Sequence, residues 1–173
     1  MRKAPYISSG DSALLRGELA KYAGHLALEI GAGNVGGLIT LSRRFNYVVG
    51  TDIIRPEMRD WPRSKSDFVL ADRATCFKEN SFDLVAFNPP YLPSDSVEDI
   101  AVDAGTDSEV PLAFFREALR VVKGTGRVVM TLEGETSENK VKEEASSKGF
   151  TVKPVCAERR FFETLGIYES FKL

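Results

Sequence analysis

Short apolar runs recur along the chain, and each contains three to seven residues, which is the length of a strand. Runs of this kind, without polar alternation, are typical of strands buried on both faces of a parallel sheet. Polar residues or glycines follow most of the runs and mark where the strands should end. The pattern therefore predicts seven strands, at residues 26–30, 47–49, 68–71, 82–87, 127–132, 150–155 and 165–171.

Helical spacing is found between several of these runs, at residues 35–44, 112–122 and 137–147. Strands that alternate with helices favour an α/β fold around a mostly parallel sheet. The connection at residues 157–164 has no helical pattern, so the last two strands should form a C-terminal hairpin that contains one antiparallel strand. Residues 92–110 form a long irregular segment, and loops of that length inside a compact domain are usually functional.

The composition is that of an ordinary globular domain, because 43% of the 173 residues are hydrophobic and 28% are charged. This length suits one domain, which we predict to span residues 1–173. No apolar run approaches the roughly 18 to 20 residues of a membrane-spanning helix. The charged start of the chain lacks the apolar core of a secretory signal. We therefore expect a cytoplasmic protein that does not enter a membrane.

Charge and residue type disfavour several functions. The net charge is −2, and residues 94–115 contain six acids with no lysine or arginine, so this stretch should repel a phosphate backbone. Nucleic acid is therefore disfavoured as a partner. The two cysteines, Cys76 and Cys156, are isolated and His25 is the only histidine, so we expect no metal site and no histidine-based nucleophilic catalysis.

A glycine-rich turn should connect the first strand to the first helix. Gly31, Gly33 and Gly36 have the Gly-x-Gly-x-x-Gly spacing, which lets the backbone approach a flat nucleoside ligand. Asp52 ends the second strand, where its carboxylate oxygens could accept the hydroxyl protons of a ribose. The predicted cofactor site also includes Ile53, the next residue. These features fit both NAD and S-adenosylmethionine.

Two further acids favour S-adenosylmethionine. Glu29 ends the first strand, where a carboxylate would face a cationic ligand and would disfavour a pyrophosphate. Asp72 ends the third strand, where it could accept a hydrogen bond from an adenine amino group, and Arg73 could offer its backbone N–H to the ring. Together with Asp52 they place carboxylates at three successive strand ends, which suits a sulfonium and an α-amino group.

The run Asn88-Pro89-Pro90-Tyr91 follows the fourth predicted strand, at the edge where ligands of open α/β sheets bind. A planar amide or aromatic amine is a poor nucleophile until its N–H hydrogens are held by acceptors. The Asn88 side-chain oxygen and the Pro89 carbonyl, stiffened by the two prolines, are two such acceptors. Tyr91 could stack on the planar group. These residues predict methylation of a planar nitrogen, with Asn88 also beside the cofactor.

On these motifs the chain resembles the class I S-adenosylmethionine-dependent methyltransferases, and among them the release-factor glutamine methyltransferases of HemK/PrmC type. The resemblance implies a Rossmann-like fold, S-adenosylmethionine as methyl donor and S-adenosylhomocysteine as product. It also suggests that Ser12 contacts the cofactor, because residues 9–15 are similar to a segment that folds over it. The similar segments are residues 29–33, Asp52, Asp72, residues 88–91, residues 104–107 and residues 163–165.

The chain resembles the short archaeal and eukaryotic branch of that family, because residues 1–25 are too few for the helical N-terminal domain of the bacterial members. Members of this branch require a small zinc-binding activator protein, so the resemblance implies a heterodimer. We expect the activator to cover a sheet edge at residues 67–70, since unpaired edges need cover. The implied substrate is the glutamine of the Gly-Gly-Gln loop of a translation release factor.

Other functions remain open from the sequence. An adenine-N6 methyltransferase of DNA or RNA would share the Asn-Pro-Pro-Tyr run, but it would need base flipping and a basic track that the composition lacks. A protein lysine methyltransferase would present a different side chain to the same pocket. A non-catalytic cofactor-binding subunit would have no need of Asn88 and Tyr91. An NAD-binding module would require a substrate domain and a catalytic histidine.

Overall fold

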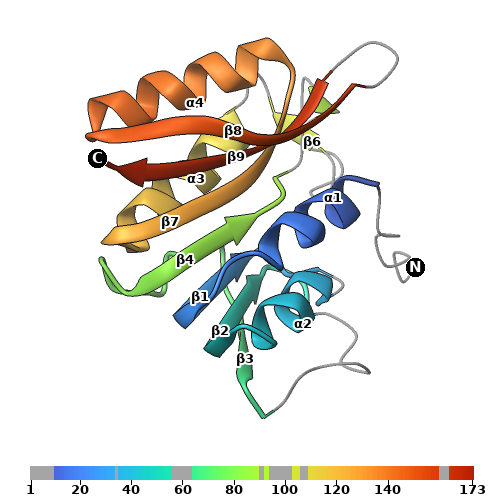
Figure 1. The fold of residues 1–173 in the computed structure, drawn as a ribbon, viewed down its shortest axis with the longest axis vertical. Coiled ribbons are helices and arrows are strands. Elements are labelled where there is room, and N and C mark those ends of the chain that lie inside the picture. Colours follow the sequence, from blue (N-terminus) through green and yellow to red (C-terminus); the bar gives the residue numbers. More distant parts are fainter. Residues whose placement is uncertain are drawn as a thin grey trace.

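The computed structural model describes residues 10–33, 35–55, 64–89, 92–93, 103–105, 109–159 and 164–173. Its main sheet has the strand order β3-β2-β1-β4-β7-β9-β8 (Figure 1). The seven predicted strands and the α/β fold class are therefore confirmed. The strands of this sheet are β1 (Gly24–Ile30), β2 (Phe45–Asp52), β3 (Ser66–Leu70), β4 (Phe82–Phe87), β7 (Val122–Glu133), β8 (Phe150–Arg159) and β9 (Thr164–Lys172).

The strand directions also agree with the sequence prediction. β1 runs parallel to β2 and β4, β2 runs parallel to β3, and β4 runs parallel to β7. β9 is inserted between β7 and β8 and is antiparallel to both, which confirms the C-terminal hairpin. The carboxyl ends of β1, β2, β3, β4 and β7 consequently lie along one edge of the sheet.

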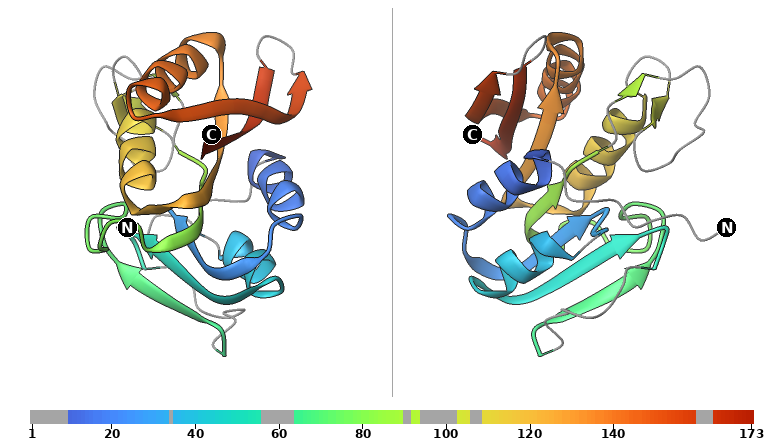
Figure 2. Two further views of the ribbon diagram at one scale, coloured as in Figure 1. Left: turned by 60° about the vertical axis from the view of Figure 1, so that its left-hand side comes forward. Right: turned by 90° about the vertical axis from the view of Figure 1, so that its right-hand side faces the viewer.

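Two layers of helices cover the sheet (Figures 1 and 2). α1 (Gly10–Leu19) and α2 (Gly36–Ser42) lie on one face, while α3 (Glu109–Val121) and α4 (Glu135–Ser147) lie on the other. The helices predicted at residues 35–44, 112–122 and 137–147 are confirmed with small changes at their ends. α1 was not predicted, because Gly17 interrupts a short segment whose polar and apolar residues have no strong helical period.

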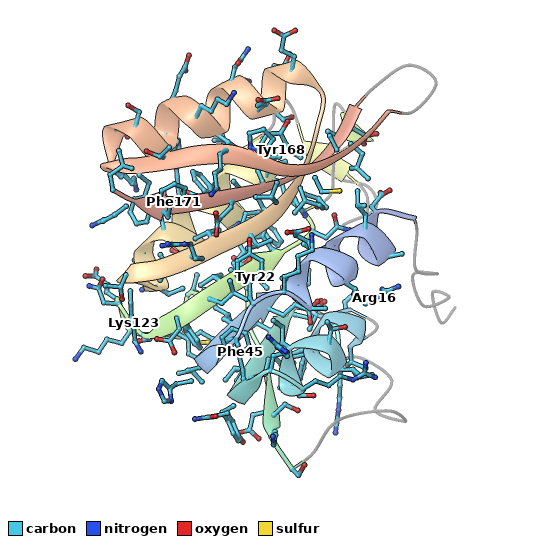
Figure 3. All side chains as sticks on the ribbon, in the orientation of Figure 1. Arg16, Tyr22, Phe45, Lys123, Tyr168 and Phe171 are labelled. Atoms are coloured by element: carbon cyan, nitrogen blue, oxygen red, sulfur yellow. The ribbon has the colours of Figure 1, made fainter. Side chains whose placement is uncertain are left out.

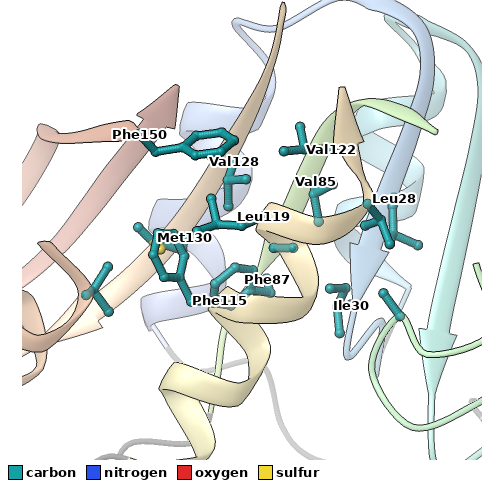
Figure 4. Close-up of a cluster of buried hydrophobic side chains, with 14 of the residues drawn as sticks. Leu28, Ile30, Val85, Phe87, Phe115, Leu119, Val122, Val128, Met130 and Phe150 are labelled. Carbon is teal, nitrogen blue, oxygen red and sulfur yellow. The ribbon is translucent and has the colours of Figure 1, made fainter. Parts of the chain in front are cut away.

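Each face of the sheet has its own apolar core, as the alternation of side chains in a strand requires. On the side of α3 and α4, Phe87 and Met130 pack with Phe115 of α3 (Figure 4). On the side of α1 and α2, Ala86 and Val129 pack with residues such as Leu15 of α1. Neighbouring residues of β4 and β7 therefore point to opposite faces.

The segment predicted to be irregular, residues 92–110, contains a second small sheet. β5 (Leu92–Pro93) pairs in parallel with β6 (Asp103–Gly105), and α3 begins at Glu109. These strands were not predicted, because they are too short to produce a recognisable pattern of apolar residues. Within the described ranges, no helix has both the length and the apolar character needed to span a membrane.

Candidate functional site

The glycine turn after β1 is built to expose its backbone. Gly31 and Gly33 have φ values of 74° and 40°, in the left-handed region that glycine adopts without a steric penalty. The N–H groups of Gly31 and Ala32 donate to the Thr51 carbonyl at 2.8 and 2.9 Å. These bonds attach the turn to the end of β2, as the predicted cofactor loop requires.

Asp52 lies directly beside this turn. Its Oδ2 accepts a hydrogen bond from the Gly33 N–H at 3.0 Å, and its Oδ1 accepts one from the Ile54 N–H at 3.0 Å. Each carboxylate oxygen has a second lone pair, so both oxygens can still accept a ribose hydroxyl. Ile53, also predicted at the site, is exposed beside Asp52. The structure thus brings Gly31, Gly33, Asp52 and Ile53 together.

Glu29 is located differently from what the sequence suggested. Its side chain is buried against the start of α2, where it accepts a hydrogen bond from the Leu38 backbone N–H. Burial raises the pKa of this carboxyl to about 8, while the Leu38 N–H and the positive charge of Arg16 on α1 act in the opposite direction (Figure 3). Its Oε2 is buried and has no hydrogen-bond partner among the described residues. Glu29 is therefore enclosed between β1 and α2 rather than presented openly at the strand end.

Asp72 and Arg73 follow β3 at the same edge of the sheet. The Arg73 guanidinium donates to Asp72 Oδ2 at 2.7 Å, and Asp72 remains mostly exposed. The Ala71 N–H donates to the Asp52 carbonyl at 2.9 Å, which holds this turn close to the end of β2. Arg73 has a φ of 53°, an uncommon value for a residue with a side chain.

Arg120 of α3 holds the segment after Asp72, a role that the sequence did not reveal. Its guanidinium donates to the carbonyls of Phe77 and Ala74, each at 2.8 Å, and also binds Glu117. The planar fork of arginine suits such convergent acceptors. The loop that follows β3 is thereby fixed against α3.

Asn88 occupies the carboxyl end of β4 and faces two other polar side chains. Its Nδ2 donates to Ser12 Oγ of α1 at 3.4 Å, and its Oδ1 accepts a short hydrogen bond from Thr131 Oγ1 of β7. Pro89 is buried directly after it. The structure therefore brings Ser12 and Asn88 together, as predicted members of one site. Pro90 and Tyr91 lie outside the described residues, so the predicted stacking role of Tyr91 remains a prediction.

The acceptors and donors of this edge are of the kinds that would suit a nucleoside-bearing ligand next to a carboxamide. The glycine turn offers backbone, Asp52 and Asp72 offer carboxylates, and Asn88 offers an amide. Thr131 and Arg120 were missed, because neither belongs to a recognisable motif. Among the residues described, no group of three His, Cys, Asp or Glu side chains is placed to hold a metal ion.

Comparison with known proteins identifies the fold of the chain. No protein-family model and no curated protein matches the chain. Among solved structures, a chain of the E. cuniculi Mtq2–Trm112 complex, described as responsible for methylation of the eRF1 translation termination factor, is 26% identical, with a TM-score of 0.75 over 97% of this chain and 98% of that chain.

Two more distant structures have the same fold. A putative RNA methyltransferase from Pyrococcus horikoshii is 16% identical, with a TM-score of 0.66 over 95% of this chain and 82% of that chain. A Burkholderia thailandensis 1,6-didemethyltoxoflavin-N1-methyltransferase with bound S-adenosylhomocysteine is 15% identical, with a TM-score of 0.62 over 95% and 77%. The chain therefore has the Rossmann-like fold of the S-adenosylmethionine-dependent methyltransferases, which is the fold class predicted from the sequence.

Proposed function

We propose that this chain is an S-adenosylmethionine-dependent N-methyltransferase whose substrate is the side-chain amide of the glutamine in the Gly-Gly-Gln loop of a translation release factor. The observation that carries the proposal is the position of Asn88. Its carboxamide lies at the carboxyl end of β4, next to buried Pro89 and beside the strand that leads into the glycine turn. A carboxamide oxygen and a stiff backbone carbonyl are a suitable pair of acceptors for an NH₂ group.

The residues present fit the proposed cofactor. The left-handed glycines leave the backbone of the turn open, and Asp52 keeps one lone pair on each oxygen for ribose hydroxyls. Asp72 is exposed enough for its carboxylate to meet an adenine amino group. Acidic side chains also suit a cationic cofactor better than a pyrophosphate, which argues against NAD. S-adenosylmethionine, when bound, supplies an electrophilic methyl group.

The residues of the chain would act by orienting the nitrogen. The Asn88 oxygen and the Pro89 carbonyl would accept the two N–H hydrogens of the substrate amide, so that its lone pair is directed toward the cofactor. No general base is needed before transfer, since the N–H proton becomes acidic only as the new bond forms. We assign Asn88 and Pro89 as catalytic residues, together with Tyr91 as a stacking partner.

Two observations favour a protein amide over a nucleobase. The structure in the E. cuniculi Mtq2–Trm112 complex, described as acting on eRF1, is similar to this chain over nearly its full length. The segment at residues 94–115 is acidic, and a nucleic-acid backbone would be repelled there. The likeness to a putative RNA methyltransferase is only 16% in sequence and supports the fold alone.

The partner that we propose is a small zinc-binding protein at the β3 edge. β3 is the terminal strand of the sheet and pairs with β2 on one side only, within the described residues. Two exposed apolar side chains lie near the carboxyl end of this edge, and we call them the β3 patch. The β3 patch consists of Leu70 of β3 and Ile54, which follows β2. An open strand edge beside apolar side chains suits a protein that adds a strand.

The test is a methyl-transfer assay with and without the zinc-binding partner from the same organism. Methyl-labelled cofactor is offered with release factor, with release factor whose loop glutamine is replaced by glutamate, and with adenine-containing oligonucleotides. We expect label on the first substrate only. Label on the oligonucleotides but not on release factor would reject the proposal, and label that persists on the glutamate variant would point to another side chain such as lysine.

A further inference from the structure

Thr131 lies beside Asn88 because of the register of two parallel strands. Phe87 of β4 is paired with Met130 of β7, and both side chains point into the core shared with α3. Thr131 is the next residue of β7 and Asn88 directly follows the end of β4, so both point to the opposite face, where α1 carries Ser12. The sheet itself therefore brings a hydroxyl to the predicted catalytic carboxamide.

We propose that Thr131 is a positioning residue, whose hydroxyl fixes the Asn88 carboxamide with its oxygen available to the substrate nitrogen. The inference rests on the proposed function, because it assigns Asn88 the role of accepting a substrate N–H. Thr131 Oγ1 donates to Asn88 Oδ1, and Asn88 Nδ2 donates to Ser12 Oγ at 3.4 Å. Each end of the carboxamide thus has a partner of the right polarity.

The physical reason is that a free carboxamide turns easily. The last side-chain torsion of asparagine is broad and roughly two-fold, so its oxygen and its NH₂ group exchange places at small cost. If the NH₂ group were turned toward the substrate, two hydrogen-bond donors would face each other and no hydrogen bond could form. In the observed orientation Thr131 donates to the oxygen and Ser12 accepts from the NH₂ group, so turning the carboxamide would break both bonds and require both hydroxyls to reorient. That oxygen has two lone pairs, and one remains for the substrate.

The position of Thr131 supports this role over simple packing. Its side chain is fully buried, and its neighbour on the same face, Val129, is apolar. A valine would fill nearly the same volume without burying a polar group. A buried hydroxyl is unfavourable unless it is hydrogen-bonded, so packing alone would favour valine at this position. The branched Cβ of threonine also limits its χ1 rotation, which keeps the hydroxyl in place.

The test compares Thr131→Val, which removes the hydroxyl, with Thr131→Ser, which retains it. We expect Thr131→Val to lower kcat on the order of 10- to 30-fold while the Kd for the cofactor stays within about twofold, and Thr131→Ser to recover most of the rate. Thr151→Val, the same change on β8 away from the site, should leave kcat unchanged. Equal losses in Thr131→Val and Thr131→Ser, or a full rate in Thr131→Val, would overturn the proposal.

A second measurement is independent of turnover. The ¹⁵N order parameter of the Asn88 side-chain amide should fall in Thr131→Val and remain high in Thr131→Ser, as read by NMR in the free protein. An unchanged order parameter in Thr131→Val would overturn the positioning role even if activity fell. If the wild-type chain methylates no amide but the order parameter behaves as expected, the proposed function fails while the positioning of Asn88 by Thr131 stands.

Discussion

Glu29 and Gly37 are fitted to each other across the start of α2. A Cβ atom at Gly37 would lie 1.9 Å from Glu29 Oε1 and 2.4 Å from its carboxyl carbon. Only glycine leaves room for the buried carboxyl group, which accepts a hydrogen bond from the Leu38 N–H. The acid that precedes the glycine turn is thus part of the contact between β1 and α2.

This relationship predicts a severe effect of Gly37→Ala. The added methyl must displace the buried carboxyl group from its hydrogen bond with the Leu38 N–H, so we expect a loss of about 1–3 kcal/mol in the free energy of unfolding. Chemical denaturation measures this loss. Gly17→Ala is the matched control, because no atom lies within 4 Å of a Cβ at Gly17 in α1. That change should stabilise the helix by about 0.5–1 kcal/mol, and equal effects of the two variants would contradict the fit.

The burial of Glu29 predicts an unusual pH dependence of stability. In the folded chain its pKa is raised from an ordinary value of 4.5 to about 8, so between these values the folded state holds a proton that the unfolded state has lost. The contribution of Glu29 to the free energy of unfolding therefore decreases as pH rises from about 4.5 to about 8 and is constant above that.

Glu29→Gln tests this dependence, since glutamine has nearly the same shape and cannot ionise. The free energy of unfolding of Glu29→Gln minus that of the wild type should increase with pH across this window, by at most about 1.4 kcal/mol per pH unit. Urea denaturation at a series of pH values gives the difference. A difference that is flat from pH 5 to pH 8 would mean that Glu29 is ionised in the folded chain.

Much of the fold could be predicted because its strands are buried on both faces. Such strands appear in the sequence as continuous apolar runs. The strand predicted at residues 82–87 has the observed ends, and the hairpin of the last two strands follows from a connection without a helical pattern. The position of Asp52 at the site followed from the strand that ends there. Local pattern was sufficient in each case.

The features that could not be predicted from the sequence depend on contacts between segments that are distant along the chain. Thr131 lies 43 residues from Asn88 and Arg120 lies 43 residues from Phe77, so only the sheet register and the packing of α3 bring each pair together. Glu29 was correctly placed at a strand end, but its direction depends on the absence of a side chain at Gly37. A contact with a distant residue produces no periodic pattern of apolar and polar residues in the sequence.

Asp52→Asn should weaken cofactor binding on the order of 10- to 100-fold. Hydrogen bonds to a charged acceptor are stronger than those to a neutral one, and in asparagine an NH₂ group replaces one of the two accepting oxygens. Isothermal titration with S-adenosylmethionine or S-adenosylhomocysteine measures the change. Glu135→Gln provides a control of equal charge change, since Glu135 is exposed at the start of α4. Unaltered affinity in Asp52→Asn would remove Asp52 from the cofactor site.

Asn88→Ala should separate binding from turnover. The carboxamide oxygen is assigned to the substrate nitrogen, so we expect kcat to fall on the order of 100- to 1,000-fold. The Kd for the cofactor should change by less than about threefold, because the turn and Asp52 are intact. Single-turnover transfer and cofactor titration give the two numbers. Full turnover in Asn88→Ala would refute the assigned role of Asn88.

Leu70→Asp tests the β3 patch as the contact with the proposed zinc-binding partner. Leu70 is 63% exposed at the terminal strand of the sheet, so a charge there should not disturb the core. In the complex it would place an unpaired carboxylate in an apolar contact. We expect the Kd of the complex, measured by calorimetry, to rise roughly 30-fold, which corresponds to about 2 kcal/mol.

The control for this variant is Leu173→Asp, which makes the same change at a fully exposed residue that directly follows β9. It should leave the affinity for the partner unchanged. The midpoint of denaturation should be the same for both variants and the wild type when the chain is alone, which excludes unfolding as the cause. If Leu70→Asp binds the partner as tightly as Leu173→Asp does, the β3 patch is not the contact, and the activator must bind elsewhere.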